Sequence, residues 1–235
     1  MIAMLKKVLF AILGVLIIGV TAYGAALVMS DTYSVTLGQH SFNIPKQYSR
    51  HGAVPQWLMK VRGLDDGSRD YMLEFPAEEI ATAVPGYKTA DGKYKEDIRA
   101  ILAVLTPVEV KRNQDSGRYR DLWYAENSYR DRIIEPYPNR PWFRVYRKVE
   151  YPYSWAVVKK SPQDGHTLPH EVFDFWVSHC LSGNSPITTS GKIVRCDSYV
   201  FFDDFAIDFS VSEQNLDVID GVKAFLKSKV ESWKK

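Results

Sequence analysis

The chain has 235 residues, with 30 Lys and Arg against 28 Asp and Glu and a formal net charge of +2. This length accommodates one sizeable hydrophobic core or at most two small domains. Charges of both signs are interleaved along the chain. This argues against a nucleic-acid-binding protein, which would carry a basic surplus. The 14 tyrosines and 6 tryptophans supply core volume, and such residues are also common anchors of protein interfaces.

The N-terminal segment predicts a membrane helix. Lys6 and Lys7 precede an uncharged apolar run over residues 8–29, which at about 1.5 Å rise per residue spans a hydrocarbon core of about 30 Å. The two lysines favour a cytoplasmic N-terminus, which places residues 31–235 across the membrane. We therefore expect residues 1–30 to be a cytoplasmic stub and a transmembrane signal anchor. A cleaved signal peptide, ending near Ala22-Tyr23-Gly24, is the alternative, and the length of the run disfavours it.

The first half of the outer region predicts strands separated by turn-rich connections. Alternating apolar residues on either side of a Gly38 turn predict a β-hairpin over residues 33–44. Residues 71–75 predict a strand that Pro76 ends. Residues 77–95 carry Pro-Gly and Asp-Gly pairs and predict a connection. The β-branched content of residues 97–105 favours a buried strand over a helix.

The second half predicts more strands and then a helix. The strands are residues 142–149 paired antiparallel with 155–159, followed by 172–179, 199–202 and 205–211. The last of these alternates apolar and polar residues without a break. Apolar residues at three- and four-residue steps over residues 216–233 predict an amphipathic helix, with Ser212 as its N-cap.

Taken together, these elements predict one α+β domain over residues 31–235. We expect a mainly antiparallel sheet with a C-terminal amphipathic helix that covers one face. One N-terminal transmembrane helix precedes this domain.

The chain has two cysteines, Cys180 and Cys196. In an oxidising compartment the expected state is one disulfide. Two unpaired buried thiols are the alternative. A zinc site is disfavoured because two cysteines without further ligands do not complete one.

No catalytic signature stands out in the sequence. The Gly-x-Ser-x-Gly elbow of one hydrolase fold is missing, as are the glycine-rich phosphate and dinucleotide loops. His166 and His170 are four residues apart, but a zinc-protease helix would need another histidine where Asp174 stands. The Asp203-Asp204 pair is typical of a turn between antiparallel strands. We therefore expect a protein that is not an enzyme and that holds no cofactor or metal.

One segment has the composition of an interface. Arg140 stands beside Tyr137 and Trp142 in a proline-broken stretch, and Arg with aromatic residues carries most of the binding energy at protein interfaces. These three residues are our candidate partner-binding residues. The alternative is a proline-rigid connecting loop packed on the edge of the sheet.

The layout of the outer domain resembles a known class of protein. Its features are the hairpin ending in Phe42-x-Ile44-Pro45, a tryptophan-rich middle with Trp123, Trp142 and Trp155, two cysteines flanking a variable loop, and a closing helix. This layout resembles the periplasmic immunity proteins that protect Gram-negative bacteria from type VI secretion effectors.

The resemblance implies a function without an active site. Such a protein would sit in the inner membrane through residues 8–29, with residues 31–235 in the periplasm. It would bind a cognate protein toxin and occlude the toxin's active site, and it would bind no nucleic acid. The first places to test for toxin contact are residues 181–195 and 137–142. A membrane-anchored envelope or secretion-machine assembly subunit is the alternative function.

Overall fold

The computed structural model describes residues 31–50, 70–89, 96–105, 109, 117–150, 153–162, 167–169, 175–182 and 194–235. Across these ranges, no helix is both long enough and apolar enough to cross a membrane. The predicted membrane segment, residues 8–29, lies outside the described residues, as does most of the predicted contact loop after Ser182.

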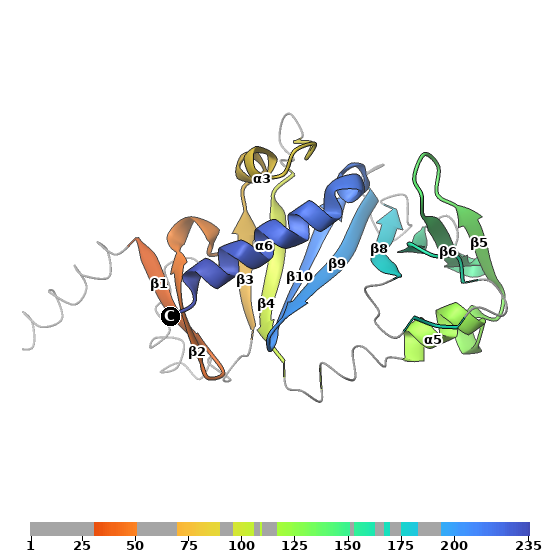
Figure 1. The fold of residues 1–235 in the computed structure, drawn as a ribbon, viewed down its shortest axis with the longest axis horizontal. Coiled ribbons are helices and arrows are strands. Elements are labelled where there is room, and N and C mark those ends of the chain that lie inside the picture. Colours follow the sequence, from red (N-terminus) through yellow and green to blue (C-terminus); the bar gives the residue numbers. More distant parts are fainter. Residues whose placement is uncertain are drawn as a thin grey trace, which may run out of the picture.

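The described residues form a hairpin and a large antiparallel sheet (Figure 1). The hairpin pairs β1 (Thr32–Leu37) with β2 (His40–Pro45). The large sheet has eight strands in the order β3-β4-β10-β9-β8-β7-β6-β5. Their bounds are β3 Asp70–Phe75, β4 Ile98–Val104, β5 Arg132–Pro136, β6 Phe143–Arg147, β7 Ser154–Val158, β8 Trp176–Ser182, β9 Val194–Phe202 and β10 Phe205–Ser212.

Helical segments connect and cover these strands. Within the described ranges, the α-helices are α3 (Ala77–Ala83), α5 (Gly117–Tyr124) and α6 (Ile219–Trp233), and the short 3-10 helices are η1 (Lys46–Tyr48), η2 (Asn127–Tyr129), η3 (Lys148–Glu150) and η5 (Glu213–Val218). Figure 1 shows α6 lying across β3, β4, β10 and β9, whereas α5 lies at the end of the sheet that carries β5 and β6. The predicted fold class, α+β with a mainly antiparallel sheet and a C-terminal helix, is confirmed for these residues.

The larger core lies between α6 and one side of the sheet. Successive side chains of a strand point to opposite sides of the sheet, so the alternating apolar residues of β10 all face α6. These residues are at most 2% exposed: Phe205, Ile207, Phe209 and Val211. The helix contributes its own apolar stripe to the same cluster. At its end the ring of Trp233 stacks on Phe75, with centroids 5.9 Å apart.

A second, smaller core lies on the other side of the sheet. In β7, Trp155 and Val157 belong to the cluster beneath α6, whereas Ala156 and Val158 belong to a cluster with residues of α5. These four residues are at most 7% exposed, so β7 is buried on both sides. The two helices therefore cover opposite sides of the sheet, over different strands.

The structure corrects the prediction for residues 77–95, which were expected to be a connection. The segment begins with α3, whose backbone donor at Ala77 is bonded to the Asp97 carboxylate at 2.8 Å. Acidic residues in its first turn suit the helix dipole, and Ile80 is fully buried. The capping group comes from the approach to β4, twenty residues later in the chain, so local turn residues did not reveal the helix.

Three further boundaries differ from the prediction. The expected strand over residues 172–179 lies in the structure as β8, Trp176–Ser182, because pairing with β9 extends to Ser182 opposite Val194. The C-terminal helix begins at Ile219 and not near Leu216, because η5 precedes it, and Ser212 makes no side-chain capping bond. The predicted strand 199–202 is the end of β9, which begins at Val194, and the other predicted strands and the hairpin are confirmed within one or two residues.

Candidate functional site

The disulfide between Cys180 and Cys196 is confirmed and joins β8 to β9 at directly opposed positions. Both residues are fully buried in the larger core. Trp155 on β7 is opposite Cys180, and Val211 on β10 is opposite Cys196. The disulfide is therefore the centre of a row of buried side chains that crosses four strands.

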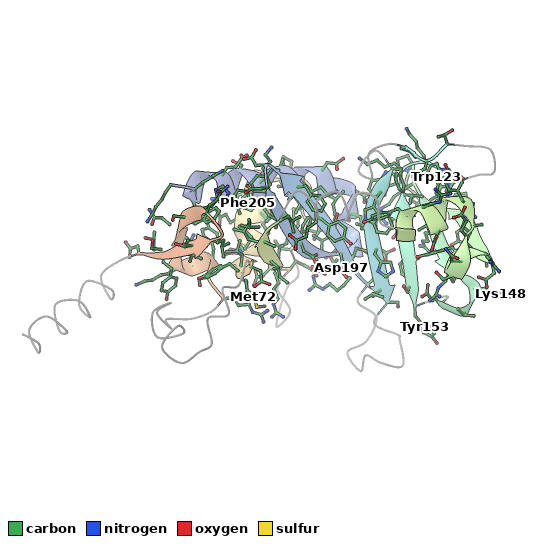
Figure 2. The ribbon with its side chains drawn as sticks, turned by 90° about the horizontal axis from the view of Figure 1, so that it is seen from below. Met72, Trp123, Lys148, Tyr153, Asp197 and Phe205 are labelled. Carbon is green, nitrogen blue, oxygen red and sulfur yellow. A yellow bond between two sulfur atoms is a disulfide. The ribbon has the colours of Figure 1, made fainter. Side chains whose placement is uncertain are left out.

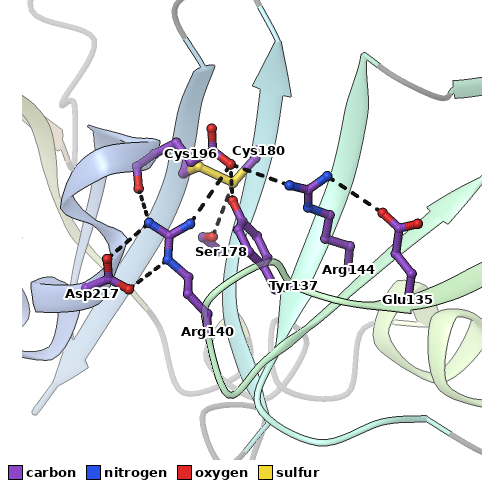
Figure 3. Close-up of polar contacts among 9 residues, drawn as sticks. Glu135, Tyr137, Arg140, Arg144, Ser178, Cys180, Cys196 and Asp217 are labelled. Atoms are coloured by element: carbon purple, nitrogen blue, oxygen red, sulfur yellow. Dashed lines mark hydrogen bonds and ion pairs between the residues drawn. A yellow bond between two sulfur atoms is a disulfide. The ribbon is translucent and has the colours of Figure 1, made fainter.

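A polar and aromatic network lies beside this disulfide (Figure 3). It begins in the turn between β5 and β6, where the Tyr137 backbone N–H donates to the Trp142 carbonyl oxygen at 2.8 Å. The Tyr137 hydroxyl donates a hydrogen bond to Glu213 in η5. Arg140 donates from Nε to Asp217 at 2.7 Å and from Nη2 to the Glu213 carbonyl oxygen at 2.9 Å.

Arg144 of β6 adds a second layer to the network. Its guanidinium lies over the rings of Tyr137 and Trp155, at 4.4 and 5.2 Å from their centroids. It also pairs with Glu135 at 3.6 Å and with Glu213 at 3.8 Å. Stacking on aromatic rings while pairing with carboxylates suits the planar guanidinium, which a lysine could not match.

Burial sets the electrostatics of this network. Desolvation, and then the hydrogen bond to Glu213, raises the pKa of Tyr137. Burial is the largest single influence on Arg140 and lowers its pKa, but the hydrogen bond to Asp217 together with the charges of Asp217 and Glu213 and the Tyr137 hydroxyl outweighs it and leaves this pKa above its ordinary value. The tyrosine is thus a neutral donor and the arginine a permanent cation. The network joins the β5–β6 turn to the segment that leads into α6.

The three predicted partner-binding residues therefore already have contacts within the chain. Tyr137 is 3% exposed, the Arg140 side chain is 12% exposed, and Trp142 packs against the larger core. The alternative interpretation, a rigid connecting loop packed against the sheet, describes these contacts. A role of Tyr137, Arg140 and Trp142 in partner binding stays a prediction.

Replacing Tyr137 with phenylalanine is expected to destabilise the fold by about 2 kcal/mol. The substitution keeps the ring but removes the donor to Glu213, and a hydrogen bond to a charged group contributes about 1.5–3 kcal/mol. Urea unfolding of Tyr137→Phe measures the loss. The matched control is Tyr153→Phe, at a residue 37% exposed, which should change stability little. Equal values for the two variants would contradict a stabilising role of the network.

The side of the sheet turned away from α6 carries a second candidate surface, which we call the outer face. It is formed by Met72, Ile101, Asp208, Asp197, Tyr199 and Phe201, which alternate with the core residues of β3, β4, β10 and β9. Figure 2 shows Met72 and Asp197 on the opposite side of the sheet from Phe205. Sequence analysis identified the alternation of β10 but not this surface, because its members come from four strands.

An acidic pair lies within the outer face. Asp208 is opposite Tyr199 and Asp197 is opposite Ser210, so the two aspartates are diagonal neighbours, typically about 7–8 Å apart between Cα atoms. Partial desolvation, and then the negative charge of Asp197, raises the pKa of Asp208 to about 6. Desolvation also raises the pKa of Asp197, partly offset by a hydrogen bond from Ser210 and by Arg195.

The raised pKa predicts that Asp208→Asn stabilises the protein at neutral pH. The pKa of Asp208 is about 6 in the folded protein, above its ordinary value of 3.8. As pH rises between these two values, the carboxyl group ionises more readily in the unfolded state, so the free energy of unfolding falls. After allowance for solvent screening at this exposed position, the gain should be about 1 kcal/mol at pH 7.5. It should vanish near pH 3.5. Thermal unfolding of both proteins across this range is the measurement, and an equal gain at all pH values would contradict it.

The other acidic and histidine residues considered above lie in a turn or are hydrogen-bonded, except His166 and His170, which lie outside the described residues. Asp203 has a positive φ of 51° in the turn between β9 and β10, as the sequence predicted for this pair. Asp204 bonds His40 Nε2 at 2.6 Å and so joins this turn to the hairpin. His179 bonds the Ser154 hydroxyl at 2.9 Å. In the part of the chain that the structure describes, no group of three or more His, Cys, Asp or Glu residues could hold a metal ion.

Comparisons with known proteins give one structural likeness. No protein-family model and no curated protein matches the chain. Among solved structures, an immunity protein of the Stenotrophomonas maltophilia type IV secretion system matches with a TM-score of 0.43 and 13% sequence identity, over 87% of this chain and 94% of that chain. This likeness assigns no role to any residue described above.

Proposed function

We propose that this chain is a non-catalytic immunity protein that binds a cognate toxin and blocks the toxin's active site. In this proposal residues 8–29 hold it in the inner membrane and residues 31–235 lie in the periplasm. The toxin is an effector of a secretion system, type VI being the system that the layout of the sequence suggests. Binding is stoichiometric, and the protein itself performs no reaction.

One observation carries the proposal: the centre of the sheet is cross-linked into a preorganised scaffold. The buried disulfide joins β8 to β9, and the network of Tyr137, Arg140 and Arg144 joins the β5–β6 hairpin to η5. A scaffold that is already ordered loses less conformational entropy on binding, which favours tight association. A disulfide is also typical of proteins that work outside the reducing cytosol.

The experiment is a recovery of partners followed by a protection assay. The full chain, with an affinity tag, is expressed in its native host and isolated in mild detergent, and bound proteins are identified by mass spectrometry. We expect one partner in a one-to-one complex. Exported alone to the periplasm of a test strain, that partner should stop growth, and co-expression of the full chain should restore growth.

Other outcomes would contradict the proposal. A partner that is harmless when exported is not a toxin. Recovery of several envelope-complex subunits would favour the alternative function, a membrane-anchored assembly subunit. A toxin that still kills in the presence of the full chain would show that binding is not neutralisation.

A further inference from the structure

The outer face combines accessible apolar side chains with acidic ones. Met72 is 37% exposed and Ile101 is 40% exposed, and the two residues are directly opposed on β3 and β4. Ile101 is in turn opposite Asp208, and Asp208 is opposite Tyr199. One continuous row of four side chains therefore crosses β3, β4, β10 and β9, with an acid between apolar and aromatic neighbours.

The aromatic end of this row is held in place. Tyr199 packs against the core cluster that includes residues of α5. Its ring lies 6.1 Å from that of Phe201, the next residue on the same side of β9. Aromatic side chains fixed in this way offer a large contact area at low cost in conformational entropy. Such a surface differs from the scattered single apolar residues that are normal on proteins.

Three arginines near the outer face pair with acids other than Asp197 and Asp208, although the charge of Arg195 also lowers the pKa of Asp197. Arg99 and Arg50 both pair with Glu74, at 3.7 and 3.6 Å, and Arg195 pairs with Glu96 at 3.3 Å. Asp197 and Asp208 carry like charges that repel each other, and this repulsion adds to desolvation, the larger cause, in raising the pKa of Asp208. An incoming cation would relieve this repulsion, so the charge of the surface is complementary to a basic partner.

We propose that the outer face is the docking surface for the toxin, and that a basic side chain of the toxin lies between Asp197 and Asp208. Met72 and Ile101 on one side and Tyr199 and Phe201 on the other contact apolar groups around that cation. This inference rests on the proposed function, because it names the surface and the chemistry of the same interaction. An arginine suits the site best, because its planar guanidinium pairs with carboxylates and stacks on aromatic rings.

The first test compares matched charge removals in the full chain. Asp197→Asn with Asp208→Asn removes two negative charges from the outer face and keeps the shape of the side chains. Asp220→Asn with Glu231→Gln removes two from α6, where the side chains are 71% and 47% exposed. Calorimetric titration with the toxin recovered above should show about tenfold or greater weakening for the first variant. It should show less than about twofold for the second.

Salt gives the same experiment a second readout. Raising the salt concentration should weaken wild-type binding more steeply than binding by the outer-face variant, since the screened interaction is gone from that variant. Equal affinities for wild type and the outer-face variant would overturn the docking surface and leave the immunity function standing. A larger loss in the α6 variant would likewise overturn it.

A second test needs no toxin. The full chain with labelled methyl groups is titrated with arginine amide, and citrulline amide serves as the analogue with an uncharged side chain. Both are acetylated at the α-amino group, so the guanidinium is the charge that distinguishes them. Arginine amide should shift the methyl signals of Met72 and Ile101 but not those of Val149, a distant residue 78% exposed, and citrulline amide should shift none of them. If no neutralised toxin is found, the proposed function fails. This titration still tests whether the outer face binds a basic side chain. Unmoved Met72 and Ile101 signals, or equal movement at Val149, would overturn it.

Discussion

Replacing both Cys180 and Cys196 with alanine is expected to lower the free energy of unfolding by about 3 kcal/mol. The cysteines are 16 residues apart in sequence, and closing a loop of this size removes conformational entropy from the unfolded chain. Both are fully buried, so the loss of packing adds to the effect.

The measurement is urea unfolding of the wild type and of the double variant. A companion sample of the wild type, unfolded under reducing conditions, separates the covalent contribution from the packing contribution. The stability of reduced wild type should fall between those of the oxidised wild type and the double variant, because its thiols keep packing that alanine removes. A loss of less than about 1 kcal/mol in the double variant would show that the pairing of β8 with β9 needs no cross-link.

The loss of stability in the double variant should also be local. Cys180 and Cys196 lie in one row with Trp155 and Val211, and Trp155 supports Arg144 of the network. Hydrogen exchange should therefore speed up in β7, β8 and β9 of the double variant before it does in β3 and β4. Uniform acceleration across the sheet would contradict this local role.

Phe205→Ala is expected to cost about 3–5 kcal/mol, the usual range for a fully buried phenylalanine. Phe205 is 1% exposed, and its ring lies near the hairpin, near Phe202 of β9 and near the segment after α6. Its ring centroid lies 4.6 Å from that of His40 and 5.5 Å from that of Phe42 in the hairpin. Lys234, just after α6, places its ammonium group 5.0 Å from the same centroid.

The matched control is Phe201→Ala, on the neighbouring strand but on the outer face. Phe201 is only partly buried, so truncation there should cost about 1 kcal/mol. Guanidinium unfolding gives both values. Hydrogen exchange in β1 and β2 should accelerate in Phe205→Ala alone, because that ring attaches the hairpin to the sheet. Similar losses in the two variants would contradict the assignment of the larger core to one side.

The acidic pair and the network show why the candidate site could not be predicted in full. Tyr137, Arg140 and Trp142 are close in sequence and were visible as a cluster. Their partners Glu213 and Asp217 are more than 70 residues away. Asp197 and Asp208 are ordinary surface acids in the sequence. Only the register of β9 with β10 makes them diagonal neighbours.

The sequence by itself determined the local elements. Apolar residues at every second position predict β10 and the hairpin, and apolar residues at three- and four-residue steps predict α6. The presence of two cysteines restricted the disulfide to one pairing. These features depend on residues close in the chain, so they can be read without knowledge of the fold.

The tertiary structure alone decided the order of the strands, the burial of β7 on both sides and the existence of α3. Each of these depends on groups distant in sequence: pairing between strands, two helices on opposite sides, and the Asp97 carboxylate that caps Ala77. The outer face also depends on distant groups, because its residues come from four strands and the sequence of a single strand does not reveal it. Long-range pairing brings its apolar and acidic residues together, and a shift of one residue in register would turn them into the core.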